Sequence, residues 1–318
     1  MLFNNLTTFH HVRNFMLRLC VFALLLIAVV MNAQADITPW TEMKVQNGHI
    51  SIPVKVSGIE TYAVLDTGSQ LNAINRAFRN KNNLSFSKGK KVNIRGINGI
   101  EKMQTFNKVP VSFFGVETTL NKVTDMAMGH HSNGILLGAT FLEQFVIQMD
   151  YPNQRIRFIT HNAIDMAKLE NIEFQLHKSK SMPLVKLGLG SDKEVWVLFD
   201  TGNNGGVLFD RSLAETMGWS NNLTDIQTMT VDATSHISVM DNYRIPELQF
   251  GPYTLENVLV SVPSDSKLNL LERHRELGSR IRGKRVQGIL GYDVLQHFVV
   301  TVDYKNGHAH IGVPEDAN

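Results

Sequence analysis

The chain has 318 residues, of which 43% are hydrophobic, 19% charged and 8% aromatic, and this excludes a disordered, collagen-like or multi-span membrane protein. Its formal net charge of +2 lacks the strong basic excess that marks nucleic-acid-binding proteins. The single cysteine, Cys20, excludes an intramolecular disulfide and a cysteine-based zinc site.

Residues 1–35 have the pattern of a secretory signal peptide. Arg13 and Arg18 precede an uninterrupted apolar run at 20–31, and the small residues Ala33 and Ala35 supply a cleavage site. The alternative is a retained membrane anchor, but the run is shorter than the roughly 20 residues that span a bilayer. We therefore expect cleavage after residue 35 and export to the periplasm or the extracellular space, with no stable membrane span in the mature chain.

The remaining sequence predicts short strands. Valine, isoleucine, threonine and phenylalanine cluster in runs of four to eight residues that are broken by glycine and asparagine. Long stretches with helical periodicity are scarce, so the sequence predicts an all-β fold. Examples of the runs are residues 52–56, 62–65, 109–114, 195–199 and 299–302.

The chain contains the same unit twice. Asp66-Thr67-Gly68 recurs 134 positions later as Asp200-Thr201-Gly202, and each triplet follows an apolar strand. A hydrophobic-hydrophobic-Gly motif follows in each half, at residues 136–138 and 289–291, and the segments that begin at these glycines match up to Tyr151 and Tyr304. Two ordinary tight turns would explain the aspartates and glycines, but neither the threonines nor the shared downstream pattern.

With these motifs the chain resembles the aspartic peptidases, in the two-lobed single-chain arrangement of pepsin, with short lobes similar to the bacterial retropepsin-like members. The resemblance covers roughly residues 45–315. It implies two homologous β-barrel lobes related by a pseudo-twofold axis, with the active site in the cleft between them. The expected organisation is a signal peptide at 1–35, an N-terminal lobe at 36–160, a linker at 161–178 and a C-terminal lobe at 179–318.

The resemblance implies a secreted or periplasmic aspartic endopeptidase with Asp66 and Asp200 as the catalytic pair. Two carboxylates at hydrogen-bonding distance cannot both ionise cheaply, so they share a proton. The ionised member accepts a proton from water, and the protonated member donates to the carbonyl oxygen of the peptide. We expect a polypeptide substrate, no cofactor and no metal. Because the two halves are fused, we also expect a monomer.

Six residues are expected to support the two aspartate loops. The glycines allow a tight turn that points N–H groups toward the carboxylates, and the threonines bond across to the opposite loop. The serine can bond the outer carboxylate oxygen, but the second loop has asparagine at that position, with a different reach. This departure keeps an alternative open, namely a non-catalytic module that binds peptides or a partner. The six residues are Thr67, Gly68, Ser69, Thr201, Gly202 and Asn203.

In the first half, residues 92–105 match the position of the hairpin flap that covers the cleft in the family. Asn98-Gly99 predicts a hairpin turn and Gly96 adds flexibility, so the expected flap tip is Gly96, Ile97, Asn98 and Gly99. Flaps of the pepsin type carry a tyrosine near the tip, and this stretch has none. The alternative is an ordinary surface hairpin.

The second half has a basic insertion at residues 264–287. Apolar residues, among them Leu270, Leu277 and Ile281, recur there at helical spacing. Such a helix could bind an acidic partner or a membrane surface, although a solvated face over a small apolar patch is the commoner arrangement and the one we expect. His308 and His310 should face the same side of a strand, without the further ligands that a metal site needs.

Overall fold

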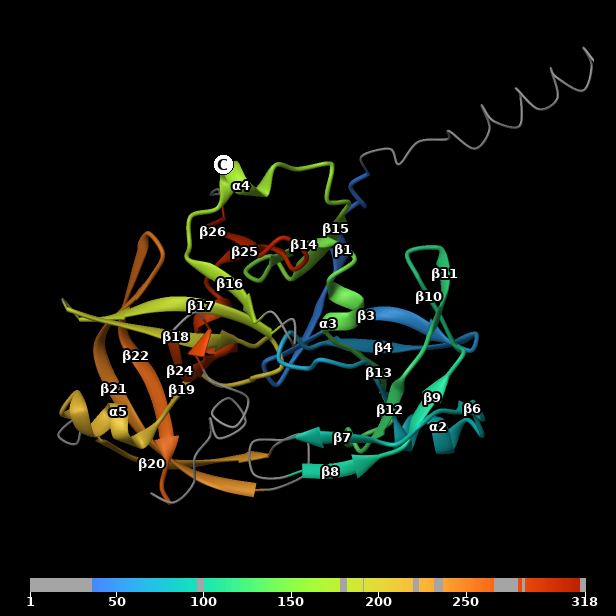
Figure 1. The fold of residues 1–318 in the computed structure, drawn as a ribbon, viewed down its shortest axis with the longest axis horizontal. Helices are drawn as coiled ribbons and strands as arrows, with labels where there is room; N and C mark the ends of the chain where they lie inside the picture. The colour runs from blue at the N-terminus through green and yellow to red at the C-terminus, as the bar shows by residue number, and fades with distance from the viewer. Residues whose placement is uncertain are drawn as a thin grey trace, which may run out of the picture. The chain divides into compact units, whose positions relative to one another are not determined.

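The computed structural model describes residues 36–95, 100–177, 182–190, 192–219, 223–231, 237–265, 280–281 and 284–314. The predicted signal peptide, the flap tip Gly96–Gly99 and most of the basic insertion lie outside these residues. The described chain consists mainly of β-strands in several sheets, with little helix, as the sequence predicts (Figure 1). None of its helices is long and apolar enough to cross a membrane.

The first half of the chain forms a ten-stranded sheet. In its strand β3, apolar side chains at alternate positions from Ile50 to Val56 are buried, as expected for a strand with one face on the core. The sheet runs in the order β11 (Val116–Leu120), β10 (Val109–Phe113), β3 (His49–Val56), β4 (Ile59–Leu65), β13 (Asn133–Leu137), β5 (Ala73–Asn75), β12 (Val123–Met126), β9 (Thr105–Asn107) and β6 (Ser87–Lys88), with β2 (Lys44–Gln46) beside β3.

The second half forms a nine-stranded sheet, yellow-green to red-orange in Figure 1. Its β16 falls within the segment predicted as a linker, and it pairs with β17. The order is β16 (Phe174–His177), β17 (Met182–Leu189), β18 (Lys193–Phe199), β24 (Lys284–Leu290), β19 (Val207–Phe209), β22 (Tyr253–Pro263), β21 (Ile237–Phe250) and β20 (Leu223–Val231), with β23 (Arg280–Ile281) beside β24.

Strand β23 corrects one expectation about the basic insertion. Ile281, the last apolar residue in the helical spacing, lies in an antiparallel pair with Lys284 rather than in a helix. Ile281 therefore does not belong to the expected helix. The rest of the helical pattern falls outside the described residues.

The strand pairings of the two sheets correspond to one another. In the first sheet β4 is antiparallel to β3 and parallel to β13, and β5 is antiparallel to β13 and parallel to β12. In the second sheet β18 is antiparallel to β17 and parallel to β24, and β19 is antiparallel to β24 and parallel to β22. The repeat in the sequence is thus also a repeat in topology.

A third sheet of five strands takes strands from both halves (Figure 1). Its centre is the antiparallel pair β14–β25, in which Met149 lies opposite Val300. The aspartate that ends each of these strands accepts hydrogen bonds from an asparagine three residues on, Asp150 from Asn153 and Asp303 from Asn306. The order is β1 (Thr41–Glu42), β15 (Arg155–Ile159), β14 (Val146–Asp150), β25 (Val299–Asp303) and β26 (His308–Gly312).

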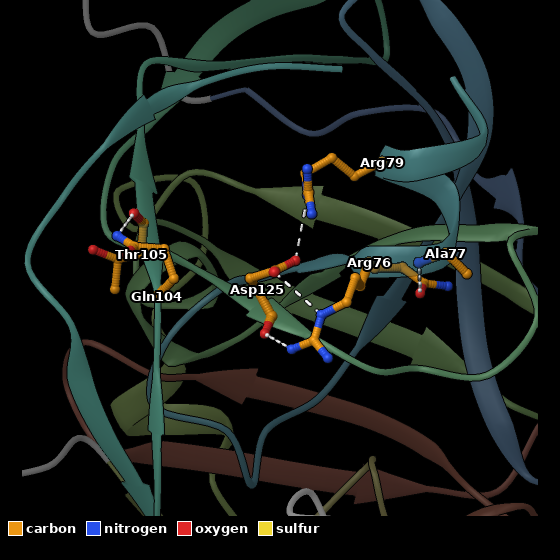
Figure 2. A network of polar contacts seen from close by, with 7 residues as sticks. Arg76, Ala77, Arg79, Gln104, Thr105 and Asp125 are labelled. Carbon is orange, nitrogen blue, oxygen red and sulfur yellow. Dashed lines mark hydrogen bonds and ion pairs between the residues drawn. The ribbon is translucent and has the colours of Figure 1, made fainter. Parts of the chain in front are cut away.

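The helices are short, and arginine side chains bind two of them to neighbouring strands. Figure 2 shows Arg76 and Arg79 of α2 on Asp125 of β12, with Nε–carboxylate distances of 3.2 and 3.4 Å. In the second half Arg211 of α5 donates to the carbonyl of Pro263 on β22 at 2.7 Å. The helices are α2 (Arg76–Lys81), α3 (Ala139–Leu142), α4 (Met166–Leu169), α5 (Arg211–Thr216) and α7 (Tyr292–Leu295).

Candidate active site

The two Asp-Thr-Gly loops begin where two equivalent strands end. Asp66 follows β4 and Asp200 follows β18, and each backbone N–H donates to a carbonyl of the parallel neighbour strand. The acceptors are Leu137, at 3.1 Å from the Asp66 nitrogen, and Leu290, at 3.0 Å from the Asp200 nitrogen. The preceding strand residues are buried, whereas the two aspartates are partly exposed to solvent. The strands therefore hold the start of each loop, while part of each aspartate remains exposed.

The glycine of each hydrophobic-hydrophobic-Gly motif lets this support come close. A Cβ added to Gly138 would lie 2.7 Å from the carbonyl oxygens of Ser69 and Leu71 in the first aspartate loop. A Cβ on Gly291 would lie 2.6 Å from the carbonyl oxygen of Asn203 in the second loop. A side chain at either position would collide with backbone, so the motif needs glycine for close approach.

Two buried threonines join the loops. Thr67 is 3% exposed and Thr201 is 2% exposed, so their polar groups need partners within the protein. The Thr67 hydroxyl accepts from the Thr201 N–H at 2.9 Å and donates to the Phe199 carbonyl at 2.7 Å. The Thr201 hydroxyl accepts from the Thr67 N–H at 3.0 Å and donates to the Leu65 carbonyl at 2.8 Å. These four bonds are reciprocal and fix each loop against the other.

The glycines of the triplets place each carboxylate against the opposite loop. A Cβ on Gly68 would collide with the carboxylate of Asp200, and a Cβ on Gly202 would lie 2.6 Å from Cγ of Asp66. The Gly202 N–H also donates to Oδ1 of Asp200 at 2.8 Å. Residues 134 positions apart in the sequence thus form one site, in which both carboxylates lie between the two triplet glycines.

A protein-family comparison agrees with this geometry. The model of a family described as aspartyl protease matches residues 185–294. Residues 185–294 are an aspartyl protease family domain. The matched segment includes the second Asp-Thr-Gly triplet, at residues 200–202, and the second hydrophobic-hydrophobic-Gly motif, at residues 289–291. A search of curated proteins finds no match.

In the aspartyl protease domain the residue after the triplet closes its own loop. The Asn203 amide donates to the Gly206 carbonyl at 3.1 Å and accepts from the Gly205 N–H at 3.2 Å. The equivalent Ser69 in the first half donates its hydroxyl to the Leu71 carbonyl at 2.9 Å. A hydroxyl donates only one hydrogen. The expected bond from Ser69 to a carboxylate is therefore replaced by a bond within the loop.

His49 is a residue at the site that sequence reasoning missed. It follows the β2–β3 turn, where Gly48 packs so tightly on the second loop that a Cβ would lie 2.9 Å from Cα of Asn204. Burial lowers the pKa of the His49 imidazole, and the negative charge of Asp200 partly opposes this shift. Nδ1 of His49 is buried without a hydrogen-bond partner. No motif marks this histidine, because its position depends on a turn meeting a loop from the other half.

Two tyrosines approach the loops from the shared sheet. Tyr151 and Tyr304 follow β14 and β25 and are 4% and 1% exposed. The Tyr304 hydroxyl donates to the Thr67 carbonyl at 2.8 Å, while the Tyr151 hydroxyl lies 3.9 Å from the Met149 sulfur. Burial raises the pKa of both phenols. The negative charge of Asp66 raises the pKa of Tyr304 further, and Tyr292 raises the pKa of Tyr151 further. The sequence repeat identifies both tyrosines as equivalent. It does not indicate that Tyr304 hydrogen-bonds an aspartate loop whereas Tyr151 does not.

The predicted flap has a hairpin stem. Strands β7 (Val92–Arg95) and β8 (Ile100–Met103) pair in antiparallel register, while the predicted tip lies outside the described residues. His308 and His310 face the same side of β26, as expected, and contact Glu170 and the Leu169 carbonyl. Among the described residues no group of three or more histidine, cysteine, aspartate or glutamate side chains could hold a metal ion.

Proposed function

We propose that the protein is an aspartic endopeptidase in which Asp66 and Asp200 act as one catalytic pair. The observation that carries the proposal is the reciprocal packing of the triplets. Each carboxylate lies against the glycine of the other loop, and the two threonines lock the loops together. The aspartyl protease family match supports a polypeptide as the substrate.

The mechanism follows from the placement of two acids at one point. Two close carboxylates share one proton, because ionising both would place like charges together in a partly buried site. The ionised member takes a proton from a water molecule as that water attacks the peptide carbonyl carbon. The protonated member donates its proton to the carbonyl oxygen, and the tetrahedral intermediate then loses the amine. The Gly202 N–H stabilises negative charge on Asp200.

We further propose that the two halves are homologous lobes related by a pseudo-twofold axis, with the boundaries at 36–160 and 179–318 and a linker between them. The matching strand pairings of the two large sheets support this arrangement. In this arrangement the β7–β8 hairpin is the flap over the substrate. The fusion of both loops in one chain makes a monomer sufficient for activity.

Export is the second part of the proposal. The basic start, the short apolar run and the Ala-x-Ala ending of residues 1–35 support removal of a signal peptide. The mature enzyme would then act in the periplasm or outside the cell. N-terminal sequencing of the protein recovered outside the cytoplasm should read from Asp36, and a protein that still begins at Met1 would overturn this part.

The test of the peptidase is to change each aspartate alone. Asp66→Asn and Asp200→Asn should each reduce cleavage of fluorescein-labelled casein by about 10³-fold or more, because either change destroys the shared-proton pair. Asp192→Asn changes an exposed aspartate and is the matched control, expected to retain activity. Activity should also persist in a chelator, since the mechanism uses no metal. Near-normal cleavage by either active-site variant would contradict the mechanism.

The alternative is a module that binds polypeptides without cutting them. The Asn203 loop favours it, because the asparagine amide is engaged with its own backbone rather than with a carboxylate. The casein assay separates the two functions. If the unchanged protein binds casein but releases no fragments between pH 3 and pH 8, the binding module is supported and the peptidase is not.

A further inference from the structure

We propose that Tyr304 is a positioning residue for the catalytic pair, acting through the Thr67–Gly68 peptide. This inference rests on the proposed peptidase function and adds a residue to its machinery. Tyr304 comes from the sheet shared by both halves, far along the chain from the first aspartate loop. Its hydroxyl nevertheless donates to the Thr67 carbonyl at 2.8 Å, in a fully buried position.

The bond acts on the peptide plane that carries the Gly68 N–H. The described chain has no cis peptide bonds, so the Thr67 C=O and the Gly68 N–H point in opposite directions. Holding the carbonyl toward Tyr304 turns the N–H to the side away from the tyrosine. Gly68 lies against the Asp200 carboxylate. In the matching loop, the Gly202 N–H donates to the aspartate of its own triplet, Asp200, at 2.8 Å, so the Gly68 N–H corresponds to a donor for Asp66.

The phenol is suited to this role because it remains a donor. Burial and the charge of Asp66 raise the pKa of Tyr304, so the hydroxyl keeps its proton at any pH at which the enzyme would work. A hydrogen bond at a peptide carbonyl also polarises the N–H of the same peptide and strengthens its bond to an acceptor. Tyr304 therefore favours the ionised form of the aspartate pair without touching a carboxylate.

The equivalent tyrosine in the first half provides an internal comparison. Tyr151 is also buried, but its hydroxyl lies 3.9 Å from the Met149 sulfur instead of at a loop carbonyl. Its ring packs against Tyr292, with ring centroids 6.1 Å apart, whereas the position that matches Tyr292 in the first half is Ala139. The asymmetry assigns the positioning role to Tyr304 alone and makes Tyr151 a matched control.

The decisive measurement is an NMR titration of the Gly68 and Gly202 amide resonances in the full exported protein. These resonances report ionisation of the aspartates without any substrate, so the result does not depend on whether the protein cleaves peptides. Tyr304→Phe should raise the titration midpoint by about 0.5–1 pH unit, because the ionised pair loses part of its N–H stabilisation. Tyr151→Phe should leave the midpoint where it is.

Activity gives a second readout. With casein as substrate, Tyr304→Phe should lower kcat about 10-fold with little change in KM. The acidic limb of its pH–rate profile should move to higher pH by the same amount as the NMR midpoint. If the unchanged protein proves inactive, the peptidase proposal fails, whereas the NMR shift still tests the positioning role. An unchanged midpoint in Tyr304→Phe, or an equal shift in Tyr151→Phe, would overturn the inference.

A variant that keeps the hydroxyl protects the test against loss of folding. Site-specific replacement of Tyr304 by 3-fluorotyrosine retains the phenol and makes it a stronger donor. The midpoint should then move in the opposite direction, to lower pH. A shift to higher pH, or none, would count against the proposal even if Tyr304→Phe does not fold.

Discussion

At the scale of single residues, His49 is a titratable group that the peptidase mechanism does not use. Its ring is largely buried and its Nδ1 has no hydrogen-bond partner. Burying a charged imidazolium without a partner is costly, which is why the pKa falls even with Asp200 nearby. The folded protein therefore holds His49 neutral at pH values where the unfolded chain protonates it.

His49→Gln should make the protein less sensitive to acid. A group whose pKa is lower in the folded state contributes stability that is complete above its ordinary pKa, about 6.5 for an imidazole, and is lost as the pH falls toward the folded value. Glutamine does not titrate, so the variant does not lose this stability as the pH falls. Melting temperatures measured from pH 7.5 to pH 4.5 should fall less steeply in the variant than in the unchanged protein.

The control for this prediction is His310→Gln on β26, where the ring contacts the Leu169 carbonyl rather than an aspartate loop. It should retain the steep fall of the unchanged protein. Parallel melting curves for His49→Gln and the unchanged protein would show that His49 does not carry the acid sensitivity. A steeper fall in His49→Gln would contradict the direction of the pKa shift.

At the scale of strands and loops, the support of each aspartate loop depends on one glycine. Gly138→Ala should destabilise the protein by about 1–3 kcal/mol, because the new methyl group would overlap backbone that cannot move independently. The methyl carbon would lie 2.7 Å from the carbonyl oxygens of Ser69 and Leu71. Urea unfolding measures the change, and cleavage of casein should fall as the first loop shifts.

Gly312→Ala is the matched control for this change. A Cβ there would meet its nearest neighbour, Nε2 of His310, at 3.6 Å, an ordinary contact distance. Its stability should remain within about 0.5 kcal/mol of the unchanged protein. If Gly138→Ala is equally harmless, the close approach of the strand end is not what positions the first aspartate loop.

At this scale the sequence predicts some of the strands and loops around the site but not all of the contacts between them. Runs of strand-forming residues and the repeated triplets predicted the strands around Asp66 and Asp200, because a buried strand shows as a continuous apolar run in the local sequence. The threonine bonds could be expected only from resemblance, since they join residues of different halves. His49 and the Tyr304 bond left no local signal. The helical spacing wrongly predicted that Ile281 lies in a helix, because strand pairing in the hairpin overrides a weak amphipathic pattern.

At the scale of the whole molecule, the described residues join the two halves at several places. The central sheet pairs β14 of the first half with β25 of the second, and the threonines join the aspartate loops. The main hydrophobic core also contains residues of both halves. A site built from both halves needs such joints, because a small shift between the halves would separate the two carboxylates.

The threonine joint predicts energetic coupling between the halves. Thr67→Val and Thr201→Val should each cost about 2–4 kcal/mol, because each change leaves a buried N–H and a buried carbonyl of the opposite loop unpaired. The double variant should lose less unfolding free energy than the two single variants lose together. The reason is that loops released by the first change no longer hold the geometry of the second pair of bonds. Urea unfolding of the four proteins gives the coupling energy.

A second cycle tests whether the coupling is specific to the joint. Thr105 is equally buried, but its hydroxyl donates to the Lys90 carbonyl at 2.6 Å, within the first half. Thr105→Val and Thr201→Val should therefore be additive within about 0.5 kcal/mol, as expected for sites without shared partners. If the Thr67 and Thr201 changes are also additive, each loop holds its shape without the other. The alignment of the catalytic pair would then depend on the other contacts between the halves, such as the central sheet.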